Sequence, residues 1–159
     1  MAVLEVLSYL VTILGFPAAI YVFIFEQRKQ RAAGVSAMHR QLSEEYDNFL
    51  KLALSNADLL LFRNSVDEEA FTEEQRERRD ILFRMLVSLF EKAYIILYQD
   101  GMEGESKRRW QSWEDDMSEW CQRDDFREQL PRLLEGEDDA FSQHILAIGR
   151  QAEGASPSS

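Results

Sequence analysis

Cysteine, proline and histidine are scarce in this sequence of 159 residues, which has one, three and two of them respectively. The single cysteine, Cys121, excludes an internal disulfide and agrees with a reducing cytoplasm. His39 and His144 stand alone in separate segments, and no Glu-x-x-His pair of the metal-binding type occurs. The sequence also lacks a phosphate-binding glycine loop and a nucleophile elbow. We therefore expect a non-enzymatic protein without a cofactor or a metal site.

Patterns typical of β-strands are absent as well. No stretch alternates apolar and polar residues convincingly, and between the proline of the first segment, Pro17, and that of the tail, Pro157, only Pro131 interrupts the chain. The sequence therefore predicts an all-α fold, with a single N-terminal transmembrane helix followed by a cytoplasmic helical bundle of about five helices.

One apolar run dominates what is present. Residues 6–25 read VLSYLVTILGFPAAIYVFIF, twenty residues without a charge, which is the length that a helix needs to cross about 30 Å of hydrocarbon. A cleaved secretory signal would have a basic segment before a shorter apolar core, whereas the only charged side chain before this run is Glu5. The run therefore predicts a retained membrane anchor, preceded by a short outer tail at residues 1–5.

Basic residues follow the run directly. Arg28, Lys29 and Arg31 lie in a basic juxtamembrane collar at residues 26–34, and no lysine or arginine precedes the run. Because positive charge stays on the cytoplasmic side, we expect a single-pass protein of the inner membrane whose C-terminal domain is cytoplasmic. The lipid bilayer is then its first partner.

Small residues line one face of the predicted span at spacings of four, three and four, namely Ser8, Thr12, Gly15 and Ala19. Such a face allows two membrane helices to approach closely, in a homo-oligomer or with another membrane protein. The same pattern also arises from the ordinary composition of a span, so both interpretations stay open.

Negative charge is confined to the rest of the chain. The net charge is −11, and residues 1–45 are neutral, so the whole excess lies in residues 46–159. An acidic body is repelled by phosphates, and we therefore expect no binding of nucleic acid. We assign residues 35–150 to an acidic helical domain and residues 151–159, which are small and polar, to a disordered tail.

Two long helices are expected in the first half of this domain. Apolar residues recur every three or four positions from Val35 to Ala53, which predicts an amphipathic helix. Thr72 and Gln75 match a capping box, from which a second helix should run to about Gln99. Residues 81–98 are apolar on nearly every face, so this second helix should be the centre of the bundle.

Three further helices are expected in the second half. Ser106 can cap a helix whose aromatic face we interpret as core rather than as a peptide groove, and the lone Cys121 as a core residue rather than a nucleophile. A short helix should begin at Asp124 or Asp125, and a last one after residues 136–139. The aromatic face consists of Trp110, Trp113, Met117 and Trp120.

Arg84, Ser88 and Glu91 form one polar stripe on the otherwise apolar second helix. The simpler interpretation of Glu91 is a structural carboxylate paired with Arg84 or with an arginine of the following helix, because an unpaired buried carboxylate is costly. The alternative is an inter-helix site of a membrane-bound enzyme or ligand sensor, built from Glu91, Arg84, Tyr94 and Arg109.

Several short motifs resemble bacterial proteins of unknown function that combine an N-terminal anchor with a small cytoplasmic helical domain. The resemblance covers about residues 45–150 and implies the fold and the topology, but no activity, cofactor or catalytic residue. It rests on residues 89–94 (LFEKAY), Arg109-Trp110, Trp113, Asp125-Phe126-Arg127 and Phe141.

Taken together, these features predict a membrane-anchored interaction or signalling module. Its work would be partner binding or self-association of the acidic helical domain. Exposed contacts are expected on acidic segments such as residues 114–116 and 137–139, unless these are ordinary solvated faces.

Overall fold

The structure is a computed structural model that describes residues 34 and 36–155. The chain divides into two units, residues 1–38 and 39–159, and the second unit forms a helical bundle. The first described helix covers residues 36–55, of which residues 39–55 belong to this unit. It is followed by the 3₁₀ turns η1 (Ala57–Leu59) and η2 (Glu68–Ala70) and by α2 (Glu73–Leu97), α3 (Gly104–Cys121), α4 (Asp124–Leu133) and α5 (Asp139–Ala155).

The all-α prediction is confirmed for the described residues, which form five α-helices and no strand. None of these helices has both the length and the hydrophobicity of a membrane span. The predicted span at residues 6–25 lies outside the described residues, and so do its small-residue face and the side chains of Arg28, Lys29 and Arg31. The membrane anchor therefore stays a prediction.

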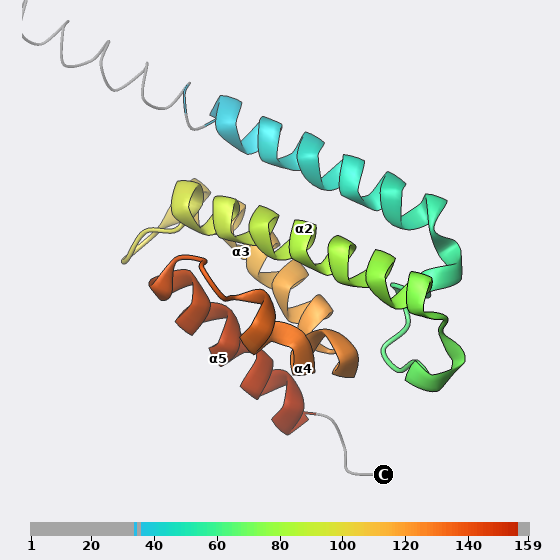
Figure 1. Cartoon of the computed structure of the whole chain (residues 1–159). Coiled ribbons are helices and arrows are strands. Elements are labelled where there is room, and N and C mark those ends of the chain that lie inside the picture. Colours follow the sequence, from blue (N-terminus) through green and yellow to red (C-terminus); the bar gives the residue numbers. More distant parts are fainter. Residues whose placement is uncertain (1–33, 35, 156–159) are drawn as a thin grey trace, which may run out of the picture. The chain divides into compact units, whose positions relative to one another are not determined.

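Residues 39–55 and α2 run antiparallel beside each other (Figure 1). Lys92 pairs with Glu45 at one end, and Arg78 bonds Asn56 at the other. The predicted apolar face of residues 39–55 is confirmed, because Leu42, Phe49 and Ala53, spaced seven and four residues apart, are buried. Met38, which the same pattern placed on that face, is exposed.

The capping box at the start of α2 is confirmed. The Thr72 hydroxyl accepts a hydrogen bond from the Gln75 amide, and the Gln75 side chain accepts one from the Thr72 amide. The helix ends at Leu97 instead of near Gln99, because Tyr98 already has an extended backbone.

The central position of α2 is confirmed, since it contacts α3, α4, α5, η1 and residues 39–55. Although residues 81–98 are apolar on nearly every face, other helices do not cover α2 on every side. Ile81, Met85 and Ile95 have 51, 43 and 62 % of their surface exposed, along one stripe of the helix. The buried stripe includes Leu82, Phe83, Leu86, Val87, Phe90 and Ala93.

The aromatic face of α3 belongs to the core, as predicted. Its tryptophans and Met117 are at most 4 % exposed, and Phe83 and Phe90 of α2 make edge-on ring contacts with Trp120 and Trp113 respectively. Ser106 is not the cap, because α3 already begins at Gly104. Cys121 is fully buried, and burial raises the pKa of its thiol to about 12, so it is the inert core residue that was predicted.

The last two helices close the bundle below α2 and α3 (Figure 1). Helix α4 begins at Asp124, as predicted, and Asp138 caps α5 by accepting bonds from the amides of Ala140 and Phe141. Gly136, with φ +94°, makes the turn between them. The predicted disordered tail is wrong for residues 151–155, which are helical; residues 156–159 lie outside the described part.

Candidate functional site

The predicted ion pair between Arg84 and Glu91 does not form in the structure. Arg84 Nε instead bonds Asp80 one turn earlier on α2, at 3.1 Å. Glu91 Oε1 accepts a hydrogen bond of 2.6 Å from the backbone amide of Asp138 at the start of α5. The expected arginine partner of Glu91 is thus replaced by a backbone donor, which satisfies a carboxylate without a second charged side chain.

Glu91 also faces the carboxyl group of Glu137. Partial burial and the neighbouring Glu91 raise the pKa of Glu137 to about 7. Near neutral pH the Glu137 carboxyl group is therefore protonated for part of the time, beside the cap of α5. This arrangement joins α5 to α2.

Within residues 34 and 36–155, no group of three or more acidic, histidine or cysteine side chains could hold a metal ion.

Tyr94, three residues after Glu91 on α2, lies in an aromatic cluster. Its ring stacks on Tyr98 with the centroids 4.7 Å apart, and Trp110 contacts both tyrosines. His144 of α5 lies 5.3 to 5.5 Å from all three rings, and its Nε2 is 3.2 Å from Glu114 without hydrogen-bond geometry. Burial, more than any neighbouring charge, raises the pKa of Tyr94.

Arg109 pairs with Glu105 on its own helix, at 2.5 Å. Its four-residue spacing and exposed partner are those of an ordinary surface pair. The four residues proposed for an inter-helix catalytic or sensory site thus have different main partners.

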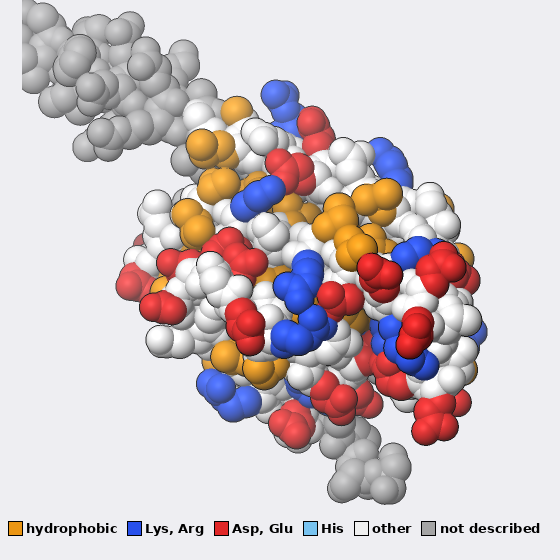
Figure 2. Space-filling model, in the orientation of Figure 1, with side chains coloured by type: hydrophobic (Ala, Val, Ile, Leu, Met, Phe, Trp, Pro, Cys, Tyr) orange, Lys and Arg blue, Asp and Glu red, His pale blue; other side chains and the backbone are white. Residues whose placement is uncertain are grey.

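A groove lies instead between residues 39–55 and α2, with a volume of about 480 Å³. Phe49 and Leu89 are buried at its floor, whereas Leu52 and Met85 are about two-fifths exposed. Figure 2 shows apolar side chains along this boundary with lysine or arginine side chains next to them. The remaining lining residues are polar, namely Glu45, Asn48, Arg84, Ser88 and Lys92.

The groove contains two members of the predicted polar stripe, Arg84 and Ser88. The third, Glu91, turns away to Asp138. Sequence reasoning missed the groove because it took the apolar residues 81–98 as a sign that the helix lies at the centre of the bundle. One helix face carried a sequence signal for incomplete burial, because a serine and a lysine interrupt its apolar residues. This face consists of Ile81, Met85, Ser88, Lys92 and Ile95, spaced four, three, four and three apart.

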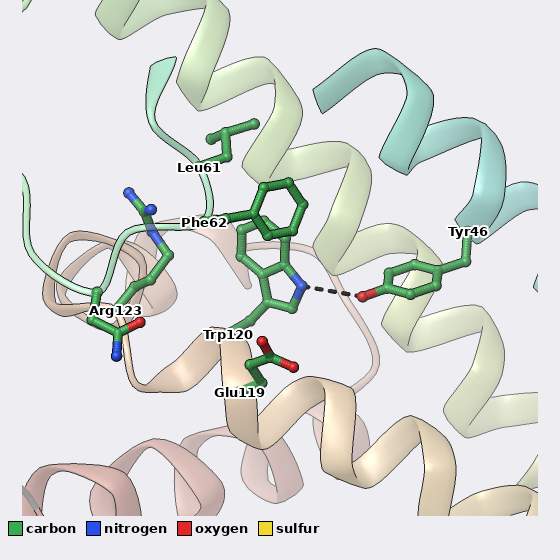
Figure 3. A pocket seen from close by; sticks show the side chains of 7 residues that line it. Tyr46, Leu61, Phe62, Glu119, Trp120 and Arg123 are labelled. Atoms are coloured by element: carbon green, nitrogen blue, oxygen red, sulfur yellow. Dashed lines mark hydrogen bonds between the residues drawn. The ribbon is translucent and has the colours of Figure 1, made fainter. Parts of the chain in front are cut away.

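A second, smaller hollow of about 50 Å³ lies where residues 39–55 approach the end of α3 (Figure 3). Trp120 Nε1 donates to the Tyr46 hydroxyl at 3.3 Å, and Phe62, Glu119 and Arg123 surround the pair. Burial raises the pKa of Tyr46 to about 12. The volume fits a water molecule but not a substrate.

The structure also contains a buried ionic cluster that the sequence analysis did not identify. Arg123 binds both oxygens of Asp125, at 2.9 and 2.6 Å, and donates to the carbonyls of Leu60 and Arg63. Arg79 pairs with Glu68 and lies 3.4 Å from Asp125. Two cations and two anions therefore balance, and they fasten the loop after residues 39–55 to α2 and α4.

Position gave the only signal for this cluster. Arg79 lies three, seven and eleven residues before Leu82, Leu86 and Phe90, so the buried stripe of α2 passes through it. Arg79 lies in the charged first part of the helix, before the apolar residues 81–98, and the sequence analysis did not assign it to the core.

Comparison with protein-family models, curated proteins and solved structures finds no match to this chain. The resemblance to anchored bacterial proteins therefore stays a prediction, and any function has to be argued from the residues themselves.

Proposed function

We propose that this chain is a membrane-anchored, non-enzymatic interaction or signalling module, whose acidic helical domain lies in the cytoplasm and acts by binding a protein partner or by self-association. The uncharged run at residues 6–25, with Arg28, Lys29 and Arg31 directly after it, is the observation that carries this proposal. It locates the domain at the inner membrane surface.

The groove between residues 39–55 and α2 favours binding over chemistry. Exposed Leu52 and Met85 extend a buried apolar floor to the surface, which is the composition of a protein-contact site. The candidate catalytic residues offer less support for the alternative, an enzyme or ligand sensor around Glu91. Glu91 holds the cap of α5, and Arg84 belongs to the groove.

The anchor is tested on the native chain in its own membranes. We expect the chain to remain in the pellet after an alkaline carbonate wash, and a protease added to the outer side of the inner membrane to leave the domain intact. Release by carbonate, or digestion of the domain from the outer side, would contradict the proposal.

The small-residue face is tested separately. Replacement of Gly15 by leucine should lower the mass of the detergent-solubilised chain if Ser8, Thr12, Gly15 and Ala19 pack against a second copy. The matched control is Ile13→Leu, which leaves that face unchanged. A monomeric mass for both the native chain and the Gly15 variant would eliminate self-association through the span.

A further inference from the structure

The walls of the groove have the length and spacing of a helix-binding site. Residues 39–55 contribute positions 45, 48, 49 and 52, and α2 contributes positions 84, 85, 88, 89 and 92. Each wall therefore presents about two helical turns, or roughly 10 Å. A trough between two antiparallel helices, with apolar side chains at three- and four-residue spacing, is the shape into which a third helix packs.

Charge around the groove is unlike that of the whole domain. The residues that line the groove include two cations, Arg84 and Lys92, and one anion, Glu45. The partner of Arg84, Asp80, is shared with Arg132 of α4. The hydrogen bond from Arg132, more than any other contact, lowers the pKa of Asp80, as expected in a locally positive environment. At the other end Lys92 and Glu45 balance each other, at 3.3 Å. The excess positive charge is therefore at the Arg84 end.

This distribution disfavours a second copy of the same face. In a two-fold pair centred on Ser88, Arg84 of one copy would approach Lys92 of the other, because both lie four residues from the centre. Two copies of the chain, each with a net charge of −11, also repel each other at long range. A lipid surface fits no better, since it is flat and its anionic headgroups repel an acidic body.

We propose that the groove binds one short amphipathic helix of a partner protein, whose apolar stripe fills the floor between Phe49 and Leu89 and whose acidic side chain lies over Arg84. This inference deepens the proposed function and rests on it, because it names the kind of partner that an interaction module would bind. Leu52 and Met85 then contact the apolar stripe from the two walls.

The test uses the full chain in lipid nanodiscs and three fluorescent helical peptides of about fourteen residues, or four turns. The first has leucines at positions 1, 4, 8 and 11 and a glutamate beside the stripe; the second replaces that glutamate by lysine; the third replaces the leucines by serine. Fluorescence anisotropy should show that the glutamate peptide binds about two- to fivefold more tightly than the lysine peptide, the range of an exposed ion pair. The serine peptide should not bind.

Charge reversal makes the test specific to the groove. Arg84→Glu should invert the preference between the glutamate and lysine peptides, and Arg84→Gln should abolish it. The matched control is Arg108→Glu on an exposed part of α3, which should leave the preference unchanged. Circular dichroism of each variant checks that the helices remain folded, and Arg84→Gln keeps the test usable if the reversed charge destabilises the chain.

Three results would overturn the inference. The first is no binding of the glutamate peptide, and the second is equal binding of both charged peptides. The third is a native chain with the mass of a dimer, if both the added peptide and the substitution Met85→Glu convert it to a monomer. That result would identify a second copy as the occupant of the groove. Failure of the anchor is a different result, because release of the native chain by carbonate would contradict the proposed function while the peptide preference still held.

Discussion

The two sides of α2 show how one helix can serve both a sealed core and an open surface. Towards α3 and α4, Phe83 is fully buried against the rings of Phe126 and Trp120, at centroid distances of 5.1 and 6.3 Å. Towards residues 39–55, Met85 is two-fifths exposed at the edge of a groove. The difference teaches that a largely apolar helix is not by itself evidence of burial on all sides.

Truncation of the sealed side should have the largest effect. Phe83→Ala removes ring contacts with Phe126 and Trp120 and leaves a cavity in the core, so the free energy of unfolding should fall by about 3–5 kcal/mol. Urea unfolding can be followed by tryptophan fluorescence, because all three tryptophans are buried. Ile81→Ala, two residues earlier and half exposed, is the control. Equal losses in both variants would contradict the comparison.

Removal of the buried negative charge should come next. Asp125→Asn removes the buried negative charge and leaves Arg123 with only neutral oxygen acceptors, so the free energy of unfolding should fall by about 3 kcal/mol. Asp124→Asn breaks a surface pair with Arg127 instead and should cost less than about 1 kcal/mol. If the two variants unfold at the same urea concentration, the cluster does not stabilise this side of α2.

Local patterns in the sequence were sufficient for the helices. The capping box at Thr72 and Gln75, the tryptophan face of α3 and the acidic cap before α5 were all predicted, because each is decided within one or two helical turns. The turn at Gly136 follows the same rule, since its φ of +94° favours glycine.

Features that depend on two distant segments were not predictable in the same way. Arg123 reaches the carbonyls of Leu60 and Arg63, some sixty residues away, and no short pattern records that contact. Glu91 was expected to need an arginine, but the amide of Asp138 supplies the hydrogen bond after α5 packs against α2. The groove was missed for the same reason, because its existence depends on how far residues 39–55 cover α2.

A pH-dependent effect is expected where α5 joins α2. The pKa of Glu137 is raised from 4.5 to about 7 by burial and by Glu91, so the folded chain retains a proton that the unfolded chain has lost. This contribution to stability is complete below about pH 4.5 and is lost as the pH rises through about 7. Glu137→Gln mimics the protonated carboxyl group and should therefore be more stable than the native chain at pH 8.

The gain should stay below about 1 kcal/mol, since the site is largely solvated and water screens the repulsion. Urea unfolding at pH 5 and pH 8 checks this expectation, with Glu135→Gln in the same exposed link as the control. A gain that is the same at both pH values would show that the carboxyl pair with Glu91 is not its cause.

Truncation of the groove should have the smallest effect on folding. Met85 is already two-fifths exposed, so Met85→Ala loses little buried area, and the free energy of unfolding should change by less than about 1 kcal/mol. The same change should weaken binding of the glutamate peptide about tenfold, because a methionine that closes over a docked helix is buried in the complex. Ile95→Ala, on the same exposed stripe but not among the groove residues, should weaken binding less than Met85→Ala. Equal loss of binding in both variants would place the docking surface along the whole exposed stripe instead of in the groove. A large loss of stability for Met85→Ala would show that this side of α2 is part of the core.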